Sequence, residues 1–191
     1  MGTGALNTLA LFKESGALLE GHFRLSSGLH SAGYLQCALV LQHPRHAEAL
    51  GEALAGKLRP LGANVVLSPA LGGLIIGHEV GRALGVRAIF AERQNNQMTL
   101  RRGFSLAAAD RVVVIEDVVT TGLSTRETIA VAAAAGATVV GAGAIVDRSG
   151  GASDVGVPMS SLVTLTLATY QADVCPLCAA GKAVDVPGSR K

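Results

Sequence analysis

The chain has 191 residues, of which 49% are apolar, and its formal net charge is +2. This length and apolar content suit one globular α/β domain, residues 1–191, with a full core. The small charge and the lack of any basic run longer than the pair Arg101 and Arg102 argue against nucleic acid as a partner.

Neither a membrane span nor an export signal is expected. The longest stretch without a charged residue, 128–146, approaches the length of a span, but its glycines divide it into a helix, a turn and a strand. The N-terminus lacks a basic region followed by an apolar core and a cleavage site. We therefore expect a cytoplasmic protein without membrane partners.

The N-terminal part of the chain combines a helix with a polar turn. Residues 6–17 carry apolar side chains at helical spacing and are closed by a glycine, which predicts an amphipathic helix. Phe23 and Leu25 alternate with polar neighbours, as in a strand. The turn that follows contains Ser26 and Ser27, whose hydroxyl and amide groups can hold a carboxylate, although an ordinary hairpin turn is the alternative.

A strand, a loop and a helix then follow one another in a recurring order. After a helix predicted over residues 43–58, residues 65–67 form a buried strand, residues 68–73 a glycine-containing loop and residues 74–84 a helix. The N-terminus of a helix offers unpaired N–H donors and the positive end of its dipole. The loop around Gly72 is therefore a candidate anion site that acts through its backbone.

The next segment is rich in arginine and amide side chains. A short strand over residues 86–90 leads to residues 94–102, which have few apolar anchors and predict a long mobile loop. Arg93, Arg101 and Arg102 can bind phosphate, because a guanidinium group pairs with oxyanions through two hydrogen bonds. A solvated surface hairpin is the alternative.

The stretch VVVIEDVVTTGLST, residues 112–125, is the most informative part of the sequence. Its four β-branched residues predict a strand buried on both faces of a parallel sheet. Glu116 and Asp117 follow at the strand end, where ligands bind in open α/β sheets, and suit sugar hydroxyls or Mg²⁺. A strand-end turn with a helix cap would also explain an acidic pair.

A phosphate loop is predicted between this strand and the helix at residues 126–135. It offers hydroxyls, a flexible glycine and free N–H groups at a helix N-terminus, and it matches neither a dinucleotide-binding nor a P-loop motif. Its members are Val118, Val119, Thr120, Thr121, Gly122, Leu123 and Ser124.

A further apolar strand, residues 138–146, delivers Asp147 and Arg148 to the same sheet edge. Arg148 can bind a substrate carboxylate, and a structural ion pair with Asp147 is the alternative. A Gly/Ser/Pro loop at 150–158 and a last alternating strand at 162–167 complete the predicted elements.

The three cysteines do not indicate a secreted disulfide framework. Cys175 and Cys178 form a CPLC motif that suits half of a zinc site, a redox pair or a reduced structural turn. A closed zinc site needs four ligands, and a dimer could supply the other two. The sequence leaves these alternatives open.

The stretch 112–125 resembles the phosphoribosyl pyrophosphate (PRPP) signature of the type I phosphoribosyltransferases. The resemblance implies a central, mainly parallel sheet over residues 60–170, flanked by helices, with a small N-terminal hood at residues 1–40 and a mobile lid loop. It implies that Glu116 and Asp117 hold the ribose hydroxyls. It also implies that the following loop binds the 5-phosphate and that Gly72 belongs to the pyrophosphate loop.

The segment FRLSSGLHSAGYLQ is similar to one branch of that family, which acts on orotate. The implied reaction is transfer of the 5-phosphoribosyl group from PRPP to orotate, which yields orotidine 5′-phosphate and pyrophosphate in pyrimidine biosynthesis. Mg²⁺ is expected to arrive with PRPP, and a homodimer is expected. A transferase for a purine base and a PRPP-sensing regulator are the alternatives.

The resemblance also assigns roles to single residues. Glu116, Asp117 and Arg93 are the expected catalytic residues, and the lid would add Arg101 and Arg102 to the PRPP site. Orotate would lie against Thr120, Arg148, Ser26 and Ser27. In the family the lid supplies Lys and His, and this lid has neither, so arginine would have to replace them.

Overall fold

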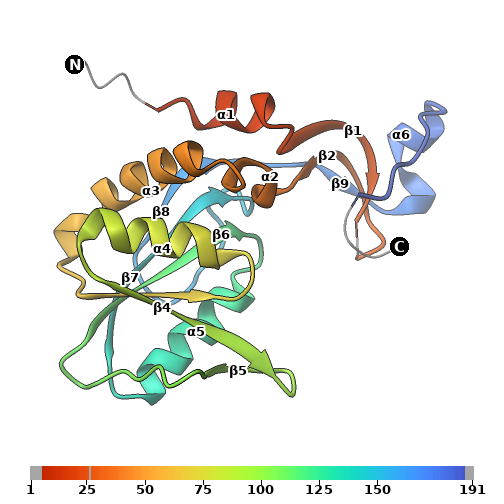
Figure 1. Ribbon diagram of the computed structural model, residues 1–191. Helices are drawn as coiled ribbons and strands as arrows, with labels where there is room; N and C mark the ends of the chain where they lie inside the picture. The colour runs from red at the N-terminus through yellow and green to blue at the C-terminus, as the bar shows by residue number, and fades with distance from the viewer. Residues whose placement is uncertain (1–5, 26, 188–191) are drawn as a thin grey trace.

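A six-stranded sheet in the order β5-β4-β3-β6-β7-β8 forms the centre of the computed structural model, which describes residues 6–25 and 27–187 (Figure 1). All neighbours pair in parallel except β4 and β5. The strands are β3 (Val65–Pro69), β4 (Arg87–Gln94), β5 (Gln97–Leu100), β6 (Arg111–Val119), β7 (Thr138–Asp147) and β8 (Met159–Thr164).

Helices cover both faces of this sheet, so the predicted α/β class is confirmed. Figure 1 shows α3 and α4 on one side and α5 on the other. The helices are α1 (Thr8–Glu14), α2 (Cys37–Leu41), α3 (Pro44–Leu58), α4 (Gly73–Leu84), α5 (Leu123–Ala134) and the short α6 (Pro176–Ala179), with 3-10 turns η1 (Arg59–Leu61) and η2 (Ala172–Val174).

The buried strand β6 divides the core into two layers, because successive side chains of a strand point to opposite faces. Val113 and Ile115 pack with the helices α1 to α4, whereas Val112 and Val114 pack with α5 and the hairpin of β4 and β5. All four side chains are fully buried. Alternate residues of the uninterrupted β-branched run therefore pack into the two layers of the core.

A second sheet of three antiparallel strands forms the hood. It consists of β1 (Leu18–Arg24), β2 (His30–Leu35) and β9 (Thr169–Tyr170) in that order. A further bridge joins Phe23 to Asp185. The predicted hood at residues 1–40 was therefore incomplete, because the C-terminal part of the chain contributes a strand and a bridge to it (Figure 1).

The prediction of a long loop at residues 94–102 was wrong. The segment is a β-hairpin, in which Glu92 pairs with Thr99 and Gln94 with Gln97. Its two-residue turn, Asn95 and Asn96, has positive φ values of 50° and 62°. Asparagine tolerates this conformation, which is the one that the favoured two-residue hairpin turn requires.

The prediction also placed the last core strand too far along the chain, at residues 162–167, whereas β8 begins at Met159 and ends at Thr164.

None of the helices in residues 6–25 and 27–187 has the length and apolar character that crossing a membrane requires.

Leu54 of α3 tests the packing of the helical layer. Its side chain is fully buried and reaches toward Gly143 of β7. We expect Leu54→Ala to lower the free energy of unfolding by about 2–5 kcal/mol, because it leaves a cavity against the sheet. The control is Ile75→Ala on α4, whose residue is 45% exposed and whose change is expected to stay within about 0.5 kcal/mol. Urea unfolding of both variants measures the difference, and equal losses would contradict this account.

Candidate active site

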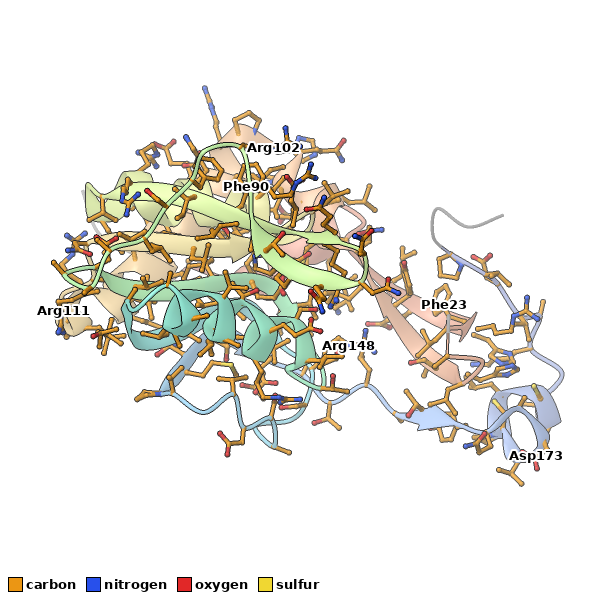
Figure 2. The ribbon with its side chains drawn as sticks, turned by 90° about the horizontal axis from the view of Figure 1, so that it is seen from below. Phe23, Phe90, Arg102, Arg111, Arg148 and Asp173 are labelled. Atoms are coloured by element: carbon orange, nitrogen blue, oxygen red, sulfur yellow. The ribbon has the colours of Figure 1, made fainter. Side chains whose placement is uncertain are left out.

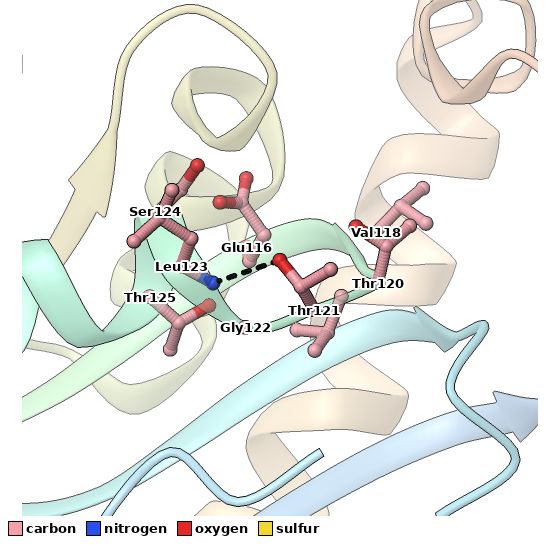
Figure 3. A pocket seen from close by; sticks show the side chains of 9 residues that line it. Glu116, Val118, Thr120, Thr121, Gly122, Leu123, Ser124 and Thr125 are labelled. Atoms are coloured by element: carbon pink, nitrogen blue, oxygen red, sulfur yellow. Dashed lines mark hydrogen bonds between the residues drawn. The ribbon is translucent and has the colours of Figure 1, made fainter. Parts of the chain in front are cut away.

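The carboxyl end of β6 opens into a pocket of about 190 Å³. Figure 3 shows that the pocket is enclosed by the strand end, the loop that follows it and the first turn of α5. Its lining is Glu116, Val118, Val119, Thr120, Thr121, Gly122, Leu123, Ser124 and Thr125. The structure thus brings together the whole loop that the sequence predicted to hold a phosphate.

Backbone geometry gives this loop the features that an anion site requires. α5 begins at Leu123, so the N–H groups of its first turn have no partner within the helix, and the pocket lies at the positive end of the helix dipole. The N–H of Leu123 donates to Thr121 Oγ1 at 3.4 Å (Figure 3). Gly122 precedes the helix with φ of +75°, and a Cβ there would lie 2.9 Å from Val155 and even closer to Ser153. Only glycine fits this position without strain.

The two acids at the strand end differ in their surroundings. Glu116 is buried, with 7% of its surface exposed, and Asp117 is half-buried. Glu116 accepts a hydrogen bond from the backbone N–H of Asp117 at 3.2 Å, and Asp117 Oδ1 accepts one from Val118 N at 2.8 Å. Burial, together with the neighbouring Asp117, raises the pKa of Glu116 to about 9. At neutral pH the free protein therefore holds Glu116 as a neutral acid that can donate a hydrogen bond.

Gly72 lies directly against the acidic pair. A Cβ at this position would be 2.7 Å from Asp117 Oδ1, so the backbone of the loop between β3 and α4 touches the carboxylate only because the residue is glycine. β3 and β6 are parallel neighbours, and their following loops therefore meet at the same edge of the sheet. The structure places the predicted second anion loop beside the first.

A larger cleft of about 1160 Å³ separates the hood from the core sheet. Figure 2 shows Arg148 between the core and the hood hairpin that carries Phe23. Of the predicted orotate residues, Ser27, Thr120 and Arg148 line this cleft, and Ser26 lies outside the described residues. The other lining residues are Arg24, Leu25, Gly28, Leu29, Tyr34, Leu35, Gln36, Thr121, Thr169, Val186 and Pro187.

Two arginines line this cleft, the exposed Arg24 and Arg148, and Arg148 is the one that the structure leaves available to a carboxylate. It is half-buried, its Nε has no hydrogen-bond partner among the described residues, and burial lowers the pKa of its guanidinium. Its neighbour Asp147 instead accepts hydrogen bonds from Ser149 N at 2.8 Å and from Gly151 N at 3.0 Å. Within the described chain no ion pair joins Arg148 to Asp147, so the guanidinium is available to a carboxylate.

The hairpin arginines are engaged elsewhere. Arg93 forms an ion pair with Glu127 of α5 and donates to Asn96 O at 3.0 Å. Arg101 and Arg102 both pair with Glu92, at 3.6 Å and 3.1 Å. None of the three lines either cavity. Their assignment to the PRPP site stays a prediction, and in this structure it requires each ion pair to open.

Sequence reasoning missed part of the cleft wall. Tyr34 lies in the segment FRLSSGLHSAGYLQ, but no pattern of apolar and polar residues indicated that its side chain lines the cleft. Thr169, Val186 and Pro187 come from the far end of the chain. No local pattern signals them, because they reach the cleft through pairing of β9 with β2 and of Asp185 with β1.

A mainly parallel sheet with a phosphate loop after an acidic pair defines the type I phosphoribosyltransferase fold. Among solved structures, orotate phosphoribosyltransferase from Aeropyrum pernix is similar, with a TM-score of 0.68 and 28% identity over 82% of this chain and 92% of that one. No protein-family model matches the chain.

Curated relatives specify the protein further. Orotate phosphoribosyltransferase of Pelotomaculum thermopropionicum is 52% identical over 96% of both chains. The relative of the same name from Carboxydothermus hydrogenoformans is 54% identical over 95% of this chain and 96% of its own length. The chain therefore belongs to the orotate phosphoribosyltransferase family.

The pKa of Glu116 has a consequence for stability. This carboxyl has an ordinary pKa of 4.5 and a folded value of about 9, so the stability that its protonated form contributes is full below pH 4.5 and is lost as pH rises toward 9. Glu116→Gln has no proton to lose at this position, so the variant avoids the decrease in stability. The free energy of unfolding of the variant minus that of the unaltered chain should therefore increase with pH by at most about 1.4 kcal/mol per pH unit.

Thermal unfolding at a series of pH values between these two limits measures the effect. Glu20→Gln is the control, because the Glu20 side chain is 76% exposed, and its curve should run parallel to that of the unaltered chain. A Glu116→Gln curve that also runs parallel would contradict the raised pKa.

Proposed function

We propose that the chain transfers the 5-phosphoribosyl group from PRPP to orotate and forms orotidine 5′-phosphate and pyrophosphate, a step of pyrimidine biosynthesis. One observation carries the proposal. The phosphate pocket and the hood cleft share Thr120 and Thr121 in their walls, so a sugar phosphate in the first meets a planar base in the second. Family membership supports the same pair of substrates.

The residues divide the substrates between them. The N–H groups at the start of α5 bind the 5-phosphate, and Glu116 and Asp117 bind the ribose hydroxyls. Asp117 also faces Gly72, whose loop binds the pyrophosphate through its backbone. Arg148 pairs with the carboxylate of orotate through its two-pronged guanidinium group.

The reaction is a displacement at the anomeric carbon of the ribose. N1 of orotate forms a bond to that carbon, the bond from the carbon to the pyrophosphate oxygen breaks, and pyrophosphate leaves. Positive charge develops on the ribose ring, so the Asp117 carboxylate stabilises the transition state, while neutral Glu116 hydrogen-bonds the ribose hydroxyls and fixed geometry supplies the remaining rate enhancement. The hood and the hairpin of β4 and β5 would exclude water from the reactive sugar.

Magnesium, a second copy and a cytoplasmic location complete the proposal. The hard oxygen donors beside Gly72 suit Mg²⁺, and Asp117 is the carboxylate that would contact an ion arriving with PRPP. When bound, Mg²⁺ neutralises the charge of the departing pyrophosphate. Family membership supports the second copy.

Orotate turnover tests the proposed reaction. The purified chain should consume orotate when PRPP and Mg²⁺ are both present, and a chelator of Mg²⁺ should stop the reaction. Adenine, guanine and hypoxanthine in place of orotate should not be consumed. Absorbance of orotate and chromatography of the nucleotide product measure these results. Turnover of a purine base without turnover of orotate would sink the assignment.

Arg148→Ala separates the base site from the sugar site. Because the variant loses a charge-assisted pair with the orotate carboxylate, its KM for orotate should rise roughly ten- to hundred-fold while its KM for PRPP changes little. Arg111→Ala is the matched control, since Arg111 binds backbone carbonyls at the opposite end of β6 (Figure 2). Equal effects of Arg148→Ala on both KM values would indicate a structural arginine.

A further inference from the structure

Four metal-binding side chains meet on the side of the hood that faces the C-terminal segment. His22 comes from β1, His30 from β2, Cys175 from the residue before α6 and Cys178 from α6 itself. Their ligand atoms all lie within 4.8 Å of one another, and none of the four residues lines either cavity of the active site. Figure 1 shows α6 close to β1, β2 and β9, far from the core sheet.

The distances match a tetrahedral zinc site. Zinc bonds of about 2.0–2.1 Å to nitrogen and about 2.3 Å to sulfur place the ligand atoms roughly 3.3–3.8 Å apart. Cys178 Sγ lies 3.3 Å from His30 Nδ1 and 3.8 Å from His22 Nε2, and Cys175 Sγ lies 3.6 Å from His22 Nε2. The two nitrogens, 2.8 Å apart, would have to separate by roughly half an ångström, and the other two pairs of ligand atoms lie within 4.8 Å, so small side-chain shifts would complete the tetrahedron.

The tautomer of His22 is already the one that a metal ligand needs. Its Nδ1 lies 2.8 Å from the carbonyl oxygen of Lys182, which can only accept a hydrogen bond. Nδ1 therefore carries the proton, and the lone pair of neutral His22 is on Nε2, the atom that faces the cluster. A backbone carbonyl that orients a histidine in this way is the usual outer partner of a metal-bound imidazole.

The C-terminal segment has little else to hold it in place. Between residues 171 and 187 Cys175 is the one buried residue, and the segment contains only a 3-10 turn and the four-residue α6. Two backbone hydrogen bonds at 2.8 Å join Asp185 to His22 and Arg24. A segment with so small an apolar contact needs a cross-link or a metal to remain ordered.

We propose that His22, His30, Cys175 and Cys178 bind one Zn²⁺ in a closed Cys₂His₂ site that fixes the C-terminal segment to the hood. The mixed nitrogen and sulfur donor set selects zinc over Mg²⁺ or Ca²⁺, and four protein ligands leave no position for a substrate. His22, His30 and Cys175 are buried, which further restricts access to the ion. The site is therefore structural, and the two histidines replace the partner subunit that the CPLC motif alone would require.

Zinc at this place also supports the base cleft. The hairpin that carries His22 and His30 provides one wall of the cleft, and Val186 and Pro187 of the anchored segment provide another part. Loss of the ion should loosen both parts of the wall. Weaker binding of orotate to the loosened cleft is expected only if the proposed function holds, whereas the zinc content and the stability of the protein do not depend on that function.

Metal analysis of the full chain, purified from zinc-containing medium, tests the site. We expect one zinc per chain by elemental mass spectrometry. A Cys175→Ser, Cys178→Ser double variant should lose it, since removing direct ligands should cost more affinity than the roughly 10- to 100-fold typical of outer partners. Cys37→Ala and His78→Ala are matched controls, because Cys37 is buried near the start of α2 and His78 is exposed on α4. Both should keep one zinc.

A second measurement needs no variant. Chelation of zinc from the unaltered chain should lower its melting temperature, and added zinc should restore it. Co²⁺ in place of zinc should give the visible bands of tetrahedral cobalt and a thiolate charge-transfer band. Overturning results are a metal-free chain whose melting temperature ignores zinc, equal zinc content in the double variant, or a Cys175–Cys178 disulfide seen as the loss of two hydrogens in the intact mass. None of these results depends on orotate turnover.

Discussion

Two carboxyl groups lie side by side at the carboxyl end of β6, where burying two neighbouring negative charges is unfavourable. Glu116 avoids this penalty by retaining its proton, and a hydrogen bond from the N–H of Val118 stabilises Asp117. Opposite them, the first turn of α5 presents N–H groups that favour negative charge. Acid at one end and amide hydrogens at the other give the pocket the polarity of a sugar phosphate, whose hydroxyls and phosphate need opposite partners.

The sheet determines that polarity. Because β3, β6 and β7 run parallel, the Gly72 loop, the acidic pair and Arg148 all follow strand ends at one edge. Their order along that edge is the proposed pyrophosphate loop, the proposed ribose acids and the proposed base arginine, which is the order of the groups that the proposed reaction joins or separates. The glycine at 72 is required by the closeness of two loops rather than by a turn.

Sequence reasoning succeeded where the signal is local. The β-branched run before Glu116, the loop through Ser124 and the charged Arg148 after β7 were all predicted from composition over a few residues. It failed where partners are distant. The pairing of β9 with β2 and the meeting of His22 with Cys175 leave no local periodicity, and two asparagines that close a hairpin look the same in sequence as two in a loop.

The hood joins the two extremes of the chain, and this has a consequence for the order of assembly during synthesis. β1 and β2 leave the ribosome early, but β9 and Asp185, which complete their sheet, follow about 135 to 165 residues later. The six-stranded layer can form as soon as β8 emerges. On the proposed function, a nascent chain therefore acquires its phosphate-binding half before its base-binding half, and selectivity for the planar substrate is the last property that translation confers.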